Sequence, residues 1–164
     1  MKRRILIVDD DLAVLLTLKA VLELHGFEVE TAGSSAEALA RIKSSVYHMV
    51  ISDLRMETEE AGLEVIRAAR RQPYDPATAL LTAYPPSGEH WRGEHRNGQH
   101  RNGQAQNGQA RNGQARNGED STGENSHSLL IKPLGTGDLL RQVEALLIRH
   151  ADTRLRRQDS ASKT

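Results

Sequence analysis

Residues 4–11 read Arg-Ile-Leu-Ile-Val-Asp-Asp-Asp, a run of apolar, mostly branched side chains that ends abruptly in three carboxylates. An apolar run without polar alternation is typical of a strand in a parallel sheet that is covered on both faces. The pattern returns at residues 49–53, Met-Val-Ile-Ser-Asp, which again end in an acid. These two stretches predict buried strands whose carboxyl ends carry acidic side chains.

Strand and helix patterns alternate along most of the chain. Further strands are predicted at 27–32, 77–82 and 129–131, and helices at 12–24, 34–42, 62–71 and 139–147. Asp11 is the expected N-cap of the first helix, and Gly26 should end it. Ser34 and Glu37 form a capping box for the second helix. This alternation predicts an α/β fold, with helices on both faces of a parallel sheet.

A tract of 40 residues, 88–127, interrupts this alternation. Glycine stands at every fifth position, each followed by Glu or Gln, and the apolar side chains of the tract are Trp91 and three alanines. A period of five fits neither helix nor strand, and a stacked repeat needs an apolar position in every unit. We therefore expect a disordered insertion within one domain at 1–150, followed by a polar tail at 151–164 that frays.

Charge and composition exclude several classes of function. Lys plus Arg number 22 and Asp plus Glu number 22, which argues against a generally basic binder of nucleic acid or membrane surfaces. The chain has no cysteine, so it has no disulfide framework and no thiolate metal site. No stretch approaches the roughly 20 apolar residues that cross a bilayer. We expect a cytoplasmic protein that binds neither nucleic acid nor membrane.

Ligands of parallel α/β sheets bind beyond the carboxyl ends of the strands. The residues expected there are Asp9, Asp10, Asp11, Asp53, Thr82 and Lys132. Carboxylates that converge repel one another, and a hard divalent cation such as Mg²⁺ relieves that repulsion. A carboxylate can also attack phosphorus and become an acyl phosphate, while a metal, an ammonium and a hydroxyl neutralise the phosphoryl oxygens. These strand ends therefore indicate Mg²⁺-dependent phosphoryl chemistry.

Four stretches together resemble the receiver domain of two-component response regulators: ILIVDDD (5–11), VISDLRM (50–56), ALLTAY (79–84) and LLIKP (129–133). The resemblance covers roughly residues 4–84 and 128–150. It implies a doubly wound, flavodoxin-like, five-stranded parallel sheet with strand order 2-1-3-4-5. It also implies a phosphoprotein of phosphorelay signal transduction.

The resemblance assigns roles to single residues. The implied metal ligands are Asp9, Asp10, Asp53 and the backbone carbonyl of Arg55. Asp53 is also the implied phosphoacceptor. Thr82 corresponds to the hydroxyl that turns toward the new phosphoryl group, and Lys132 to the lysine that pairs with that group. Asp11 is expected to cap a helix rather than to bind metal.

Three features depart from the family pattern. Glu57 stands where receivers usually have proline, and one extra residue precedes Gly62, so this loop is longer and acidic. Leu129 stands where receivers often have an aromatic residue. Only nine residues outside the repeats separate Thr82 from Lys132, too few for the usual fourth helix. We expect that helix to be missing or disordered, which would uncover apolar surface over the last two strands and favour self-association or a partner.

The leading interpretation is a stand-alone receiver that takes a phosphoryl group from a sensor histidine kinase or a phosphotransfer protein onto Asp53. It would act as an adaptor, phosphate sink or shuttle toward an unknown downstream protein, and a homodimer is one expected form. Because it phosphorylates and dephosphorylates only itself, it is a signalling domain rather than a turnover enzyme.

Two other hypotheses stay open from the residues. A degenerate receiver could serve as a binding module that is independent of phosphorylation. A haloacid-dehalogenase-like phosphohydrolase would also show Asp9 and Asp11 after a strand, followed by Thr82 and Lys132. The phosphohydrolase hypothesis leaves Asp53 without a role. It predicts that acetyl phosphate would phosphorylate Asp9 rather than Asp53.

Overall fold

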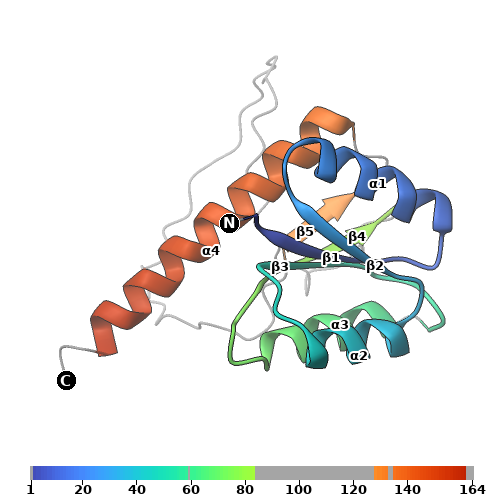
Figure 1. Cartoon of the computed structure of the whole chain (residues 1–164). Helices are drawn as coiled ribbons and strands as arrows, with labels where there is room; N and C mark the ends of the chain where they lie inside the picture. The colour runs from blue at the N-terminus through green and yellow to red at the C-terminus, as the bar shows by residue number, and fades with distance from the viewer. Residues whose placement is uncertain (1, 59, 84–127, 133–134, 162–164) are drawn as a thin grey trace, which may run out of the picture.

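The structure, a computed structural model, describes residues 2–58, 60–83, 128–132 and 135–161. Its elements are β1 (Arg4–Val8), α1 (Leu12–Leu24), β2 (Glu28–Ala32), α2 (Ser35–Ser44), β3 (Met49–Asp53), α3 (Ala61–Arg70), β4 (Ala77–Thr82), β5 (Ser128–Ile131) and α4 (Thr136–Ala161). All neighbouring strands pair in parallel, in the order β2-β1-β3-β4-β5 (Figure 1). The predicted doubly wound α/β fold and its strand order are confirmed. The predictions for the repeat tract and the absent fourth helix concern residues 84–127, which lie outside the described residues.

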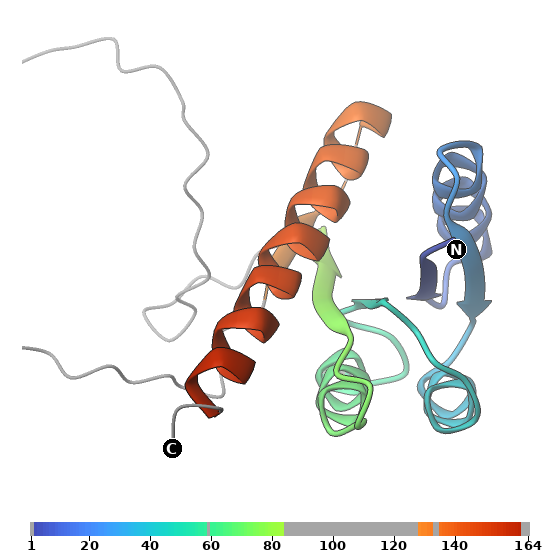
Figure 2. The ribbon, with the colours of Figure 1, turned by 60° about the vertical axis from the view of Figure 1, so that its left-hand side comes forward.

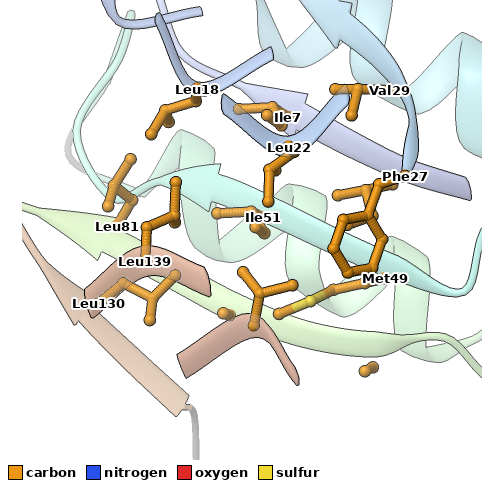
Figure 3. Close-up of a cluster of buried hydrophobic side chains, with 14 of the residues drawn as sticks. Ile7, Leu18, Leu22, Phe27, Val29, Met49, Ile51, Leu81, Leu130 and Leu139 are labelled. Carbon is orange, nitrogen blue, oxygen red and sulfur yellow. The ribbon is translucent and has the colours of Figure 1, made fainter. Parts of the chain in front are cut away.

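The helices form a layer on each face of the sheet. Helices α1 and α4 cover one face, and α2 and α3 cover the other (Figures 1 and 2). Figure 3 shows the larger core cluster, on the α1 and α4 face, which includes Ile7, Leu18, Leu22, Ile51, Leu81, Leu130 and Leu139. Each such side chain contributes about 1.5–3 kcal/mol when fully buried. Strands β1 and β3 are almost entirely apolar because both of their faces are buried in this way, whereas the edge strand β2 carries Glu28 and Glu30.

The expected helix signals at α1 and α2 are present. The Asp11 carboxylate accepts two backbone N–H groups of the first turn of α1, at 2.8 and 3.4 Å. Gly26 has a φ of 88°, a left-handed conformation that glycine adopts without a steric cost. The Ser34 hydroxyl accepts the Glu37 N–H at 3.2 Å, while the Glu37 carboxylate accepts the N–H of Gly33 at 2.9 Å. In a standard capping box the Glu37 carboxylate would accept the N–H of Ser34, the N-cap itself. Here it accepts the N–H of Gly33, one residue earlier.

Helix α4 is longer than the sequence pattern indicated. We expected its apolar stripe to end near Leu147 and the segment from 151 to fray, but the helix continues to Ala161. That expectation is wrong because residues 151–161 contain neither Gly nor Pro and carry several good helix formers. Their side chains from 151 to 160 are exposed, so no apolar stripe marked the extension.

The added turns carry α4 beyond the end of the sheet (Figures 1 and 2). Helix α4 has 26 residues, a length that could span a bilayer. Neither this helix nor any other in the described part of the chain is both long and apolar enough to do so.

Candidate functional site

The carboxyl ends of β1, β3, β4 and β5 form one edge of the sheet, which we call the acidic edge. Asp53 ends β3 and lies beside Leu81 on β4, while Thr82 ends β4 and lies beside Ile131 on β5. Lys132 directly follows β5, and its backbone N–H donates to the Thr82 carbonyl at 2.7 Å. Residues that are far apart in the chain therefore lie at adjoining strand ends.

Three carboxylates meet at this edge. One oxygen each of Asp9, Asp10 and Asp53 lies within 4.8 Å of the others. Asp9 is 1% exposed and Asp53 is 7% exposed, whereas Asp10 is exposed. The Asp11 N–H donates to Asp9 at 2.9 Å, and Asp11 itself caps α1. The structure thus brings together three of the acids named from the sequence and assigns the fourth to the helix.

Lys132 connects two of these acids. Its ammonium nitrogen lies 2.6 Å from Oδ2 of Asp9 and 3.3 Å from Oδ1 of Asp53. Burial by itself would lower the pKa of Lys132, but the hydrogen bond to Asp9 and the charges of both carboxylates raise it overall. The lysine is therefore held as an ammonium between a buried carboxylate and the end of β3.

The site has more negative than positive charge. Burial raises the pKa of Asp53 above its usual range, the charges of Asp9 and Asp10 raise it further, and Lys132 opposes them. Three carboxylates against one ammonium leave two formal negative charges uncompensated. Mg²⁺ takes few protein oxygens and keeps several of its waters, so carboxylate oxygens within 4.8 Å of one another can hold it directly or through those waters. The donor set therefore suits a hard divalent cation.

Two of the residues named from the sequence are placed at the edge without a defined role. Thr82 is 4% exposed at the end of β4. Arg55 is exposed on the loop that follows β3, two residues after Asp53. The roles expected for the Thr82 hydroxyl and the Arg55 carbonyl stay predictions.

Gly62 supports the site in a way that sequence reasoning missed. A Cβ at Gly62 would lie 2.8 Å from Cα of Leu54 and 2.9 Å from the carbonyl carbon of Asp53, and closer still to the Asp53 carbonyl oxygen. Only glycine lets the start of α3 approach the backbone of Asp53 so closely. Its signal in the sequence is a lone glycine at a helix start, which by itself has several explanations.

Glu57 also has a position that the sequence did not reveal. One of its carboxylate oxygens accepts the N–H of Ser35 at 2.9 Å. Ser35 is the first residue of α2, where unsatisfied N–H groups and the helix dipole favour a negative charge. The residue that replaces the usual proline therefore ties the loop after β3 to a neighbouring helix.

Apolar exposure over β4 and β5 is smaller than we expected. Leu80 is fully buried, and Leu129 is 7% exposed and packs in one cluster with Ile66 of α3. Ile131, at the end of β5, is 37% exposed. The expectation of uncovered apolar surface is therefore wrong for Leu80 and Leu129, which are buried and share one apolar cluster with α3.

Comparison with known proteins supplies the family of this fold and its acidic edge, and with it the class of protein, a signalling module rather than a classical enzyme. Residues 5–89 match the response regulator receiver domain, which is just over half of the chain. The chain therefore belongs to the response regulator receiver family of two-component signalling.

Curated relatives match the same region. The acid tolerance regulatory protein ActR of Rhizobium meliloti is 40% identical over 82 residues, which cover 50% of this chain and 42% of ActR. The alginate biosynthesis transcriptional regulatory protein AlgB of Pseudomonas aeruginosa is 37% identical over 81 residues, 49% of this chain and 18% of AlgB. The matched region thus spans less than half the length of these two relatives.

Solved structures agree with the fold. A response regulator receiver domain protein from Methanospirillum hungatei JF-1 superposes with a TM-score of 0.65 at 23% identity, covering 93% of this chain and 99% of that one. The response regulator protein TrrA of Thermotoga maritima gives a TM-score of 0.59 at 28% identity, covering 88% and 98%. The TrrA structure is a complex with Mg²⁺ and a beryllium fluoride.

Proposed function

We propose that Asp53 is a phosphoacceptor that takes a phosphoryl group from a sensor histidine kinase or a phosphotransfer protein in the cytoplasm. The observation that carries the proposal is the position of Lys132, whose ammonium lies 2.6 Å from Asp9 and 3.3 Å from Asp53. A half-buried cation beside a strand-end carboxylate is suited to a group that gains negative charge when it is modified. The Mg²⁺-bound TrrA structure, at 28% identity, supports the same assignment.

The proposed reaction is a transfer between two nucleophiles. A carboxylate oxygen of Asp53 attacks phosphorus, an O–P bond forms, the P–N bond to the donor imidazole breaks, and the imidazole takes up a proton. Lys132 neutralises a phosphoryl oxygen from its position beside Asp53, and the Thr82 hydroxyl donates to another. Asp53 thereby becomes an acyl phosphate that water later hydrolyses.

A divalent cation belongs to this proposal. Asp9, Asp10, Asp53 and the carbonyl of Arg55 would hold Mg²⁺. When bound, the ion supplies neutralisation of the phosphoryl oxygens and a fixed orientation for the incoming group. The two uncompensated negative charges of the acidic edge are the reason to expect it.

Helix α1 offers the surface for the donor. Leu12, Leu16, Ala20 and Leu24 recur every four residues and are exposed, with Leu12 at 67%, Leu16 at 57% and Leu24 at 82%. This apolar stripe starts beside Asp10 and Asp11, at the acidic edge itself. A helix of the donor that packs along the stripe would bring its phosphorylated side chain to Asp53, and the family resemblance supports this arrangement.

Mapping of the phosphorylated residue tests the acceptor. Acetyl phosphate with Mg²⁺ should label Asp53 alone, and Asp53→Asn should abolish the label. Label on Asp9 would instead support a phosphohydrolase. If wild type takes no label, and Asp53→Asn leaves every partner interaction unchanged, the chain is a binding module and the proposal is wrong.

A charged residue introduced into the exposed apolar stripe of α1 tests whether the donor docks there. Leu16→Glu should slow transfer from a phosphorylated donor about tenfold or more while labelling by acetyl phosphate stays unchanged. Leu155→Glu is the matched control, because Leu155 is 59% exposed on the distant part of α4. Equal transfer rates for both variants would remove α1 from the proposal.

A further inference from the structure

A cleft lies at the opposite edge of the sheet, and the α4 extension helps to form it. The cleft holds about 450 Å³. Its walls come from the segments that precede β1, β3 and β4 and from α4. Its arginine, histidine and aspartate lining residues are Arg3, His48, Asp75, His150 and Arg154. We call it the basic cleft.

The charges of the basic cleft leave an excess cation. Arg154 lies 3.8 Å from the Asp75 carboxylate and also donates to the Tyr74 carbonyl at 3.3 Å. Arg3 is exposed and forms no ion pair with an acid among the residues that the structure describes. Two guanidinium groups thus face one carboxylate, which leaves one formal positive charge.

The two histidines add hydrogen-bonding groups to the cleft. Burial lowers the pKa of His150, although Asp75 lies 3.5 Å away, so the ring is mainly neutral near pH 7. Nδ1 of His48 accepts the Arg4 backbone N–H at 3.0 Å. A neutral His48 therefore carries its proton on Nε2 and offers a donor from the lining of the cleft.

The rest of the lining is largely apolar. Tyr47 is 1% exposed, Leu147 is 7% exposed, and Tyr74, Val46 and Ala151 complete the apolar part. The Tyr74 hydroxyl donates to the Ile42 carbonyl at 2.9 Å, which holds its ring in place. A volume of about 450 Å³ falls within the range of small-molecule sites, roughly 300–1,000 Å³.

We propose that the basic cleft binds a small organic anion, a carboxylate carried on a compact apolar body. Arg3 and Arg154 take the carboxylate, His48 donates to it, and Tyr74 and Leu147 contact the body. An arginine pairs with a carboxylate through parallel N–H donors, and an apolar lining adds affinity without charge. This proposal goes beyond phosphoryl transfer and does not rest on it, because the cleft and Asp53 lie at opposite edges of the sheet.

Benzoate is the first probe, with the full chain observed by amide chemical shifts. Saturable shifts should centre on His48, Asp75 and His150 and leave residues 53–55 unchanged. Benzyl alcohol, which has the same ring without the charge, should bind about tenfold more weakly, and so should inorganic phosphate, which lacks the apolar body. Equal binding of all three probes, or benzoate shifts centred on the acidic edge, would overturn the proposal.

Substitutions of the two arginines then test whether they bind the carboxylate of benzoate. Arg3→Ala and Arg154→Ala should each raise the Kd for benzoate about tenfold, the usual scale for one charge-assisted contact. Both side chains are exposed, so the variants should fold. Arg156→Ala removes an exposed arginine of the same helix that does not line the cleft, and it should leave the Kd unchanged. An unchanged Kd in both cleft variants, or the same loss in Arg156→Ala, would contradict the assignment.

Discussion

The two edges of the sheet carry opposite charge for different structural reasons. At the acidic edge, three carboxylates lie around one ammonium, which approaches Asp9 to 2.6 Å and Asp53 to 3.3 Å. At the basic cleft, two guanidinium groups and one carboxylate line the cavity, and the ion pair between Arg154 and Asp75 is 3.8 Å long. The acidic edge is built from strand ends, whereas the basic cleft is built from loops and an overhanging helix.

This difference separates a compact site from an open one. Asp9 and Asp53 are almost fully buried, so their charges interact strongly and depend on their surroundings. Arg3 and Arg154 are exposed, so each is screened by solvent and can change with little effect on stability. Substitutions at the acidic edge should therefore have large effects on folding, and those at the cleft should act mainly on binding.

Gly62→Ala should have the largest effect on stability. The new Cβ would meet the backbone of Asp53 and Leu54, which cannot move without shifting β3. We expect a loss of about 3 kcal/mol in the free energy of unfolding, the upper range for overpacking. Urea unfolding measures the loss, which should be accompanied by weaker phosphorylation.

Gly137→Ala is the control for that variant. Gly137 lies within α4, and a Cβ there would meet nothing within 4 Å. Because alanine favours a helix over glycine, this change should stabilise the protein by about 0.5–1 kcal/mol. If both variants shift stability alike, the close approach at Gly62 is not the cause.

Lys132→Ala should cause the second largest loss of stability. It removes the ammonium from two buried carboxylates, and a hydrogen bond between charged groups is worth about 1.5–3 kcal/mol. We expect a loss of about 2 kcal/mol without Mg²⁺, measured by urea unfolding, whereas removal of the exposed Lys43 should change little. A Lys132→Ala variant as stable as Lys43→Ala would show that the acidic edge does not need its cation.

Asp53→Asn should act in the opposite direction, raising stability without Mg²⁺ by about 1 kcal/mol, a typical size for one substitution. Burial and the neighbouring acids raise the pKa of Asp53 above its usual 3.8, so the folded protein binds this proton more tightly than the unfolded chain does. Stability therefore falls as pH rises from 3.8 through the folded pKa, and the asparagine variant escapes this loss.

Two further measurements check that prediction. The difference in stability between wild type and Asp53→Asn should close as pH falls below 3.8. Excess Mg²⁺ should stabilise wild type more than the variant, and EDTA should remove that gain. A wild type that is more stable than Asp53→Asn at pH 7 in EDTA would contradict the charge imbalance.

The smallest effect on stability is expected for a substitution in the basic cleft, at His150. Burial lowers the pKa of His150 below 6.5, with Asp75 opposing and Arg154 and Arg157 reinforcing the shift. The unfolded chain then binds more protons, so stability falls as pH drops through 6.5 toward the folded pKa. His150→Gln should remove about 0.5 kcal/mol of this dependence in thermal unfolding between pH 5 and 7. An unchanged pH profile would show that His150 is not buried as described.

Much of the acidic edge could be predicted from the sequence. Apolar runs locate the strands, and parallel strands end at one edge, so Asp9, Asp53, Thr82 and Lys132 could be grouped before any coordinates. The close approach of Gly62 to β3 and the bond from Glu57 to Ser35 could not, because they depend on the path of a loop.

The basic cleft had no signal in the sequence. Arg3, Asp75 and Arg154 come from three separate segments and meet only because α4 continues past the sheet. That extension is exposed and polar, so neither periodicity nor apolar spacing marked it. The cleft depends on tertiary structure alone.

Beryllofluoride, a mimic of a phosphoryl group, tests the central claim most directly, namely that Asp53 and its neighbours form one site for a cation and a phosphoryl group. With Mg²⁺ present, it should shift the amide resonances of residues 53–55, 82–83 and 132 in wild type. It should shift none of them in Asp53→Asn or in EDTA. Equal shifts in Asp53→Asn, or none in wild type with Mg²⁺, would contradict the account.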